Sequence, residues 1–269
     1  MPAIVGKYHE ERSAMPLDRI AKMMGRCASE RPLFPPTDLY NEGWMLRLLL
    51  DWFSAHPKAG YVLAISEKER WYSEALLPSA FLPRYRGDRY AEAWTHADGV
   101  IGDFSIGESG AGDLALHPDA GNLVVLEAKM FSRLSPGITH ARYYNQAART
   151  VACMAEVLRR ANRPPSTLKR LSFFVIAPQQ QIDAGLFEHH TRPASILRTV
   201  QRRVAEYDAP RDEWFDKWFM PTMQRIGIER VSWERLIDFV AARDAGAGSE
   251  FGKFYGLCLK FNSRREPGR

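Results

Sequence analysis

The chain has 269 residues, of which 45% are hydrophobic, 26% charged and 12% aromatic, and its formal net charge is +5. These values are typical of a globular protein and exclude whole-chain disorder and a fibrous protein. The modest positive charge permits a polyanionic partner but does not require one. No run approaches the roughly 18 apolar residues of a membrane span, and no secretory signal is visible. We therefore expect a soluble, cytoplasmic protein with no membrane partner.

Hydrophobic periodicity and turn residues predict the secondary structure in chain order. A short amphipathic segment, 17–24, comes first. Helices are predicted at 37–54, with Thr37 or Asp38 as the cap, and at 138–161, 195–207 and 232–242, the last capped by Ser232. Strands are predicted at 61–65, 71–77, 99–106, 113–117, 123–130, 171–177 and 226–231.

This alternation predicts an α/β (α+β) domain whose mixed central sheet is flanked by helices. The domain is expected to span residues 35–245. Residues 1–34 would form an N-terminal arm, and residues 246–269 a tail that is glycine-rich and then basic.

The segment from Gly112 to Met130 carries the strongest chemical signal. Its middle, HPDAGN, is typical of a turn, and a hairpin centred on Ala120 would place Asp113 opposite Glu127. Lys129 lies two residues beyond Glu127 and so shares its face of the strand. We expect these three side chains to meet. Two other carboxylates, Asp98 and Asp103 on the preceding strand, are alternatives to Asp113.

Two carboxylates and an ammonium group in this arrangement indicate phosphodiester hydrolysis. Carboxylate oxygens are the ligands that Mg²⁺ and Mn²⁺ prefer, and such a cation activates water and neutralises phosphate charge. Lys129 could orient or deprotonate the attacking water. The competing interpretation is a surface salt bridge between Glu127 and Lys129. Against it, Lys129 is the only one of the nine lysines with an acidic residue two positions earlier.

This segment resembles the PD-(D/E)XK nuclease superfamily, which has the restriction-endonuclease-like fold. The similarity rests on Asp113, a gap of 13 residues, and then Glu127-Ala128-Lys129. It implies an αβββαβ core with the motif on the second and third strands. It also implies that Asp113, Glu127 and the Ala128 carbonyl bind Mg²⁺ or Mn²⁺, while Lys129 serves the nucleophilic water. The chain departs from the motif at Gly112, where the family name has proline.

Two further residues match positions that the family uses. Glu42 falls within an apolar helical stripe, where the family often has a glutamate on its first core helix. Gln146 occupies the place of a glutamine found in the RecB-like branch, but Thr150 stands where that branch has tyrosine. Without the resemblance, Glu42 is equally consistent with a helix-edge residue favoured by the macrodipole.

The sequence therefore predicts a metal-dependent nuclease that cleaves DNA, with duplex DNA as the default substrate and RNA or single strands left open. A homodimer is compatible with it. The alternative is a catalytically silent nucleic-acid-binding or regulatory protein with the same fold. A serine hydrolase that uses Ser109, in the segment GESGA, is a remote third reading because no helix is predicted after it.

Overall fold

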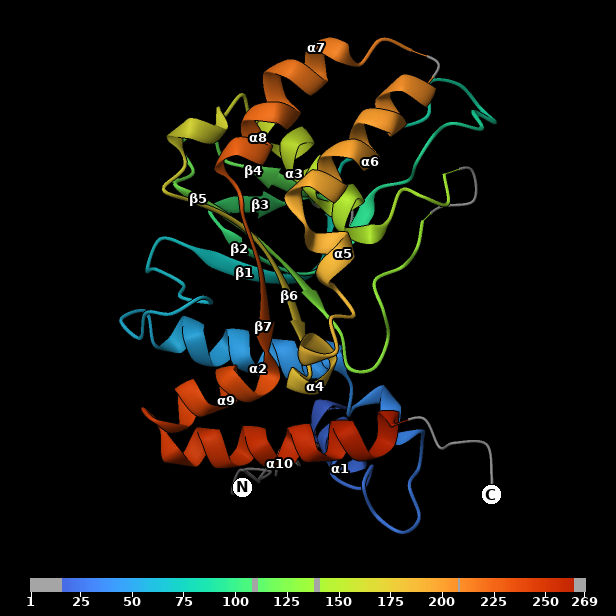
Figure 1. Cartoon of the computed structure of the whole chain (residues 1–269). Helices are drawn as coiled ribbons and strands as arrows, with labels where there is room; N and C mark the ends of the chain where they lie inside the picture. Colours follow the sequence, from blue (N-terminus) through green and yellow to red (C-terminus); the bar gives the residue numbers. More distant parts are fainter. Residues whose placement is uncertain (1–15, 108–110, 138–140, 208, 264–269) are drawn as a thin grey trace, which may run out of the picture.

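A computed structural model describes residues 16–107, 111–137, 141–207 and 209–263. At its centre is a five-stranded sheet in the order β1-β2-β5-β6-β7 (Figure 1). Its strands are β1 (Arg70–Leu77), β2 (Thr95–Gly102), β5 (Asn122–Ala128), β6 (Arg170–Ala177) and β7 (Gly227–Ser232). The pairs β1–β2 and β2–β5 are antiparallel, whereas β5–β6 and β6–β7 are parallel. This mixed, helix-flanked sheet confirms the predicted α+β class.

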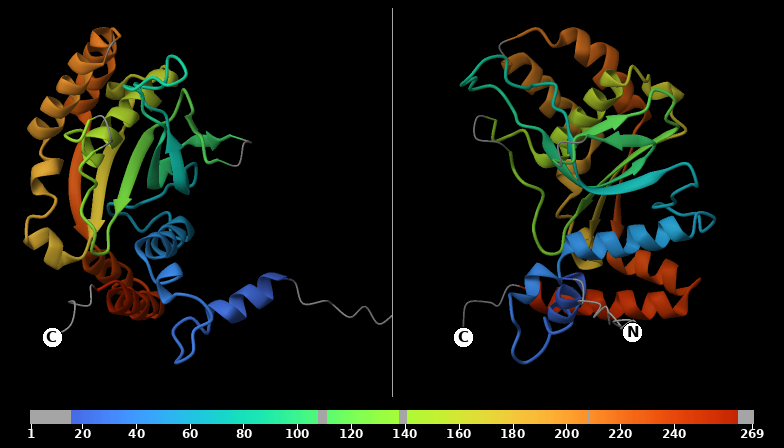
Figure 2. Two further views of the ribbon diagram at one scale, coloured as in Figure 1. Left: turned by 90° about the vertical axis from the view of Figure 1, so that its right-hand side faces the viewer. Right: turned by 180° about the vertical axis from the view of Figure 1, so that it is seen from behind.

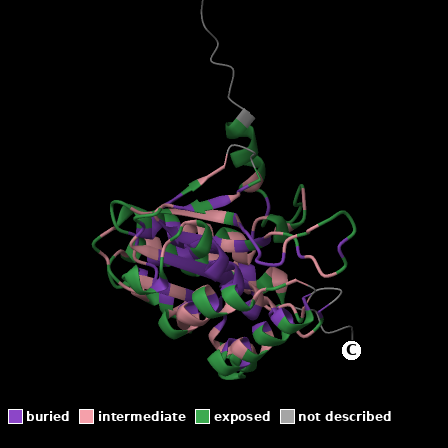
Figure 3. Cartoon of the chain, turned by 90° about the horizontal axis from the view of Figure 1, so that it is seen from above, coloured by how far each residue is buried: buried purple, intermediate pink, exposed green. Residues whose placement is uncertain are grey.

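Helices cover both faces of the sheet because the central strands are apolar on both sides. On β5, Leu123 and Val125 pack into one core and Val124 and Leu126 into the other. The first core includes α3 (Gln146–Arg160) and α6 (Pro193–Glu206). The second includes α2 (Glu42–Ala55), α9 (Trp233–Ala241) and α10 (Ala245–Asn262). Figure 2 shows the two helical layers on either side of the strands, and Figure 3 shows the sheet as the buried centre.

The remaining elements are short. They are α1 (Pro16–Met24), η1 (Pro36–Asp38), η2 (Pro165–Thr167), α4 (Gln179–Asp183), α5 (Glu188–Thr191), α7 (Asp212–Trp214), the π-helix η3 (Phe215–Phe219) and α8 (Met220–Arg225). α1 projects from the body of the molecule (Figure 2), and its apolar side chains Leu17, Ile20 and Met23 are exposed. None of the helices within the described ranges has the length and apolar character needed to cross a membrane.

The predicted hairpin between 113–117 and 123–130 is wrong. β4 (Leu114–Leu116) pairs with β3 (Phe104–Ile106) in a separate two-stranded sheet, and β5 takes β2 as its antiparallel partner. Gly102 shows how closely β2 and β5 approach, since a Cβ atom there would lie 2.6 Å from the Asn122 carbonyl oxygen. Because β5 is buried on both faces and paired at both edges, its partner is set by the whole sheet. The adjacent turn therefore does not decide its pairing.

Several predicted boundaries also change. α2 begins at Glu42 with Asn41 as its cap, rather than at Thr37 or Asp38. Residues 61–65 form a turn at 61–63 followed by irregular backbone instead of a strand, although Leu63 and Ile65 are buried. The predicted tail 246–269 is a helix over most of its length, because α10 packs against α2 and α9. The predicted Ser232 cap is confirmed, since its hydroxyl accepts a hydrogen bond from the Arg235 amide.

Candidate active site

Three carboxylate residues fall in one row across the antiparallel part of the sheet. Glu74 falls between the registered pairs Ser73–Gly99 and Ala75–Ala97 of β1 and β2, at the level of Asp98. The last β2–β5 pair at this end joins Gly99 to Leu126, so Asp98 and Glu127 are the next residues to face each other. The Asp98 side chain confirms this proximity because it accepts a hydrogen bond from the backbone amide of Ala128 at 2.6 Å.

Glu127 is the buried centre of this row, with only 1% of its surface exposed. Its Oε1 atom accepts hydrogen bonds from Lys129 Nζ and from Gln146 Nε2, each at 2.5 Å. The Gln146 side chain is held at its other end, where its carbonyl oxygen accepts a hydrogen bond from the Ser135 amide. The structure therefore brings Lys129 and Gln146 to Glu127, and what these residues do remains a prediction.

Burial and the neighbouring Asp98 carboxylate raise the pKa of Glu127 to about 8, although Lys129 opposes this shift. Burial alone would lower the pKa of Lys129, but the carboxylates of Glu127, Asp98 and Glu42 raise it overall. Lys129 therefore keeps its proton at neutral pH. This charge state suits an ammonium group that donates hydrogen bonds to water or phosphate oxygens, and does not suit a general base.

Lys129 follows β5 directly, and its backbone is fixed on two sides. Its amide donates a hydrogen bond to the Ile176 carbonyl of β6, and its carbonyl accepts one from the indole nitrogen of Trp233 on α9. Trp233 is fully buried. These contacts extend the β5–β6 ladder past the end of the strand and hold the lysine side chain beside Glu127, where its own exposure is 12%.

Two helices start at this end of the sheet, one from each face. α3 begins with Gln146, and the Asn145 cap accepts a hydrogen bond from the Ala148 amide. α2 begins with Glu42, whose carboxylate acts on the pKa of Lys129. Glu42 is thus near Lys129, as the first residue of a helix rather than within a helical stripe, and its role in the site remains a prediction. Acidic groups are favoured at that position by the helix dipole.

Asp113 does not join Glu127, so this part of the predicted site is wrong. Asp113 lies beside Leu76 in an isolated bridge on the far edge of β1, which places β1 and β2 between it and β5. Gly112 before it has a φ of +84°, which proline with its fixed negative φ cannot adopt. Asp98, one of the two alternatives, lies where Asp113 was expected.

The other alternative, Asp103, is too far along the chain to contribute. It follows the end of β2, five residues beyond Asp98, and its carboxylate contacts His117 Nδ1 at 2.8 Å. Ser109 of the hydrolase reading lies outside the described residues.

Sequence reasoning missed Glu74. Its φ of +59° is unusual for a residue other than glycine inside a strand, and its side chain pairs with Arg47 at 3.6 Å and His96 at 4.0 Å. Burial and the Asp98 carboxylate raise the pKa of Glu74. The available signal was a glutamate in the middle of the predicted strand 71–77, but no local pattern places it at the level of Asp98.

Within the described residues, no three His, Cys, Asp or Glu side chains form a group that could hold a metal ion. The pair Asp98 and Glu127 nevertheless suits a divalent cation, because the Asp98 carboxylate is near enough to raise the pKa of Glu127 and a cation between two carboxylates relieves their repulsion. Mg²⁺ sites often use only one or two carboxylates. The C=O of Ala128 points toward β2, on the same side as its N–H, so it could complete the set.

Comparisons with known proteins give no assignment for this site. No family model matches the chain, and neither the curated proteins nor the solved structures contain a match.

Proposed function

We propose that the protein is a metal-dependent nuclease of the PD-(D/E)XK type, with Asp98, Glu127 and Lys129 as its active site. The observation that carries this proposal is the contact between an acidic residue of β2 and the Glu-Ala-Lys segment at the end of β5. In chain order α2, β1, β2, β5, α3 and β6 follow the αβββαβ sequence that the resemblance implies. Asp98 then stands on the second strand of that core and Glu127 on the third.

The residues of this site have separable roles in the proposal. Asp98 and Glu127, with the Ala128 carbonyl, would hold Mg²⁺ or Mn²⁺. When bound, such a cation stabilises phosphate charge and lowers the pKa of a coordinated water. Protonated Lys129 donates to the attacking water or to a phosphate oxygen. Gln146 is a positioning residue, because its amide group fixes the Glu127 carboxylate without reaching the substrate itself.

The substrate in this proposal is DNA, with a duplex as the default. Arg133 and Arg142 are exposed and lie on the segment that joins Lys129 to Gln146, so they are suited to phosphate contact. Two other arginines are less suited. Arg203 is buried and paired with Glu92, and Arg84 is paired with Asp88.

The direct test incubates the purified chain with plasmid and linear DNA in Mg²⁺, in Mn²⁺ and in excess EDTA. Cleavage should occur with either cation and stop in EDTA. DNA binding should weaken as salt is added, because phosphate contacts release counterions. Cleavage that continues in EDTA contradicts the metal requirement. Salt-sensitive binding with no cleavage under any condition favours the silent binding protein.

A further inference from the structure

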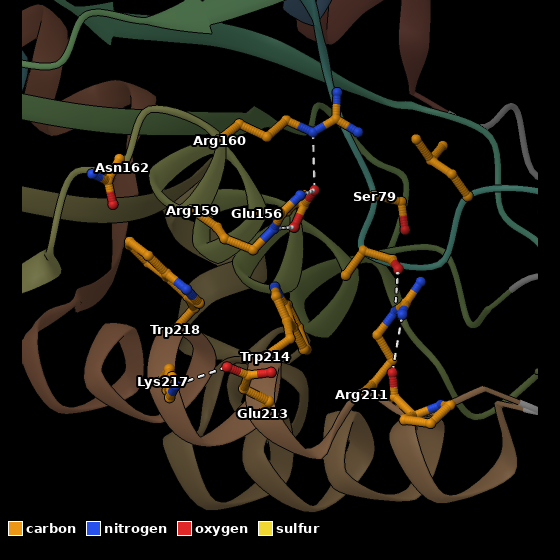
Figure 4. Close-up of a pocket in the computed structure, with 13 residues that line it drawn as sticks. Ser79, Glu156, Arg159, Arg160, Asn162, Arg211, Glu213, Trp214, Lys217 and Trp218 are labelled. Carbon is orange, nitrogen blue, oxygen red and sulfur yellow. Dashed lines mark hydrogen bonds and ion pairs between the residues drawn. The ribbon is translucent and has the colours of Figure 1, made fainter.

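A second candidate binding site lies at the other end of α3 from Gln146. Here a pocket of about 590 Å³ opens between the C-terminal turn of α3, the loop after β1 and residues 210–218 (Figure 4). Its volume lies within the range of small-molecule sites. Gln146 and Arg160 are separated by fourteen residues of helix, or about 20 Å at the usual rise of an α-helix, so this pocket is distinct from the candidate active site.

The pocket carries an excess of positive charge. Four cationic side chains and two carboxylates line it. Both Arg159 and Arg160 donate to the buried carboxylate of Glu156, at 2.7–2.9 Å, so one negative charge is shared by two guanidinium groups. Arg160 uses only its Nε atom for this contact. Its two terminal nitrogens make no hydrogen bond to any described group and remain able to grip an anion in a bidentate manner.

Two tryptophans form the aromatic part of the pocket. Trp214 is 6% exposed, yet its indole nitrogen has no hydrogen-bond partner within the described part of the chain. Figure 4 shows this nitrogen on the side of the ring that faces Glu156 and Arg159. A buried tryptophan usually has a partner for its N–H, so an acceptor is missing here. Trp218 is half-buried and belongs to the π-helix η3, a conformation often found at functional sites.

We propose that this pocket binds a nucleoside phosphate, with the phosphate on Arg160 and the base against Trp218. Guanidinium groups recognise phosphate, and an indole face stacks on a base. The ligand is either a free nucleotide or the terminal nucleotide of a DNA strand. Since no residue of the candidate active site contributes, the inference does not depend on the proposed nuclease activity.

Isothermal titration calorimetry on the full chain tests the proposal, with dAMP, deoxyadenosine, inorganic phosphate and a 5′-phosphorylated oligonucleotide as probes. All titrations are done in EDTA to prevent cleavage. We expect saturable dAMP binding that is about tenfold or more tighter than that of deoxyadenosine or phosphate alone, because both parts of the nucleotide are held. An oligonucleotide that binds more tightly than dAMP identifies a strand end as the ligand, whereas equal or weaker binding identifies the free nucleotide.

Variants then locate the binding. Arg160→Ala should weaken dAMP binding about tenfold or more, and it leaves Glu156 paired with Arg159, so the fold should persist. Trp218→Ala should also weaken it, and Trp218→Phe should restore most of the affinity. Arg235→Ala, an exposed arginine on α9, is the matched control and should bind like the parent. The proposal is overturned if dAMP does not bind at millimolar concentration, if Arg160→Ala and Trp218→Ala both bind normally, or if Glu127→Gln abolishes binding.

Discussion

Asp98 accepts a hydrogen bond from the Ala128 amide at 2.6 Å, so a side chain of β2 takes the place of a backbone acceptor at the end of β5. The contact fixes Ala128 between the two residues that carry the proposed chemistry, Glu127 and Lys129. It also places the Asp98 carboxylate near Glu127. The charge of Asp98 is the second largest cause, after burial, of the raised pKa of Glu127. This contact places Asp98, rather than Asp113, beside the segment Glu127-Ala128-Lys129.

Asp98→Asn should therefore remove most of the cleavage activity. A carboxylate that holds a catalytic cation contributes several kcal/mol to the transition state, which corresponds to a loss of roughly two to three orders of magnitude in kcat/KM. Asp113→Asn should reduce cleavage only slightly, because β1 and β2 lie between this residue and Glu127. Initial rates of plasmid cleavage in Mg²⁺ provide the measurement.

Asp103→Asn is the matched control for this comparison. Asp103 contacts His117 at the other end of β2, so its replacement should leave cleavage near the parent rate. Thermal melting must show that all three variants fold. If Asp113→Asn were inactive and Asp98→Asn active, the assignment made from the β2–β5 register would be wrong.

The reason that sequence reasoning selected Asp113 is physical. The turn chemistry of HPDAGN correctly indicates a turn, since the Ala120 amide donates a hydrogen bond to the His117 carbonyl, but the strands on either side of it do not pair. Which strand lies beside β5, however, depends on packing across the sheet, where Leu123 and Val124 are buried on opposite faces. Periodicity predicted the strand itself well, but the partner of a fully buried strand is not encoded in its neighbours along the chain.

Glu127→Gln and Lys129→Ala should each abolish most cleavage, and the double variant should be little worse than either alone. The two side chains share one hydrogen bond and one proposed task, and residues that act as a unit give non-additive losses. DNA binding measured in Ca²⁺ should survive in all three variants. Additive losses would show that the two residues act independently and would contradict a single site.

Gln146→Leu should lower cleavage about 10- to 100-fold, as is usual when a group that orients a metal ligand is removed. The side chain donates to Glu127 and accepts from Ser135, so leucine leaves the carboxylate held by Lys129 alone. Because a donor to the charged carboxylate is lost, the pKa of Glu127 should rise further, and the pH–rate profile should shift to higher pH. A profile that keeps its shape while the rate falls would indicate a structural role only.

Gln146 lies beside Glu127 and Asp113 does not, because the placement of Asp113 depended on a strand pairing that does not form. Gln146 follows a strand whose end carries Glu127, and the helix after a buried strand must return across the same face of the sheet. Its position was expected from the resemblance to the RecB-like branch, and this order of elements is consistent with it. Glu74 required knowledge of the β1–β2 register and of a left-handed backbone at a glutamate, which no sequence pattern here signals.

The metal-free protein should lose stability as pH rises toward 8, and Glu127 should be the cause. The pKa of Glu127 in the folded chain, about 8, exceeds its ordinary value of 4.5, so the folded state holds this proton more firmly than the unfolded state does. That contribution is fully present below about pH 4.5 and is lost as pH rises through about 8.

In EDTA, the Tm of the parent should therefore fall relative to that of Glu127→Gln between pH 5 and pH 9. Added Mg²⁺ at pH 8 should raise the Tm of the parent and leave that of the variant nearly unchanged, since the cation binds the charged Glu127 carboxylate. Asp103→Asn should respond to pH and Mg²⁺ as the parent does. Parallel curves for the parent and Glu127→Gln across this range would show that Glu127 is ionised in the folded protein, and the paired-acid description of the site would then be incorrect.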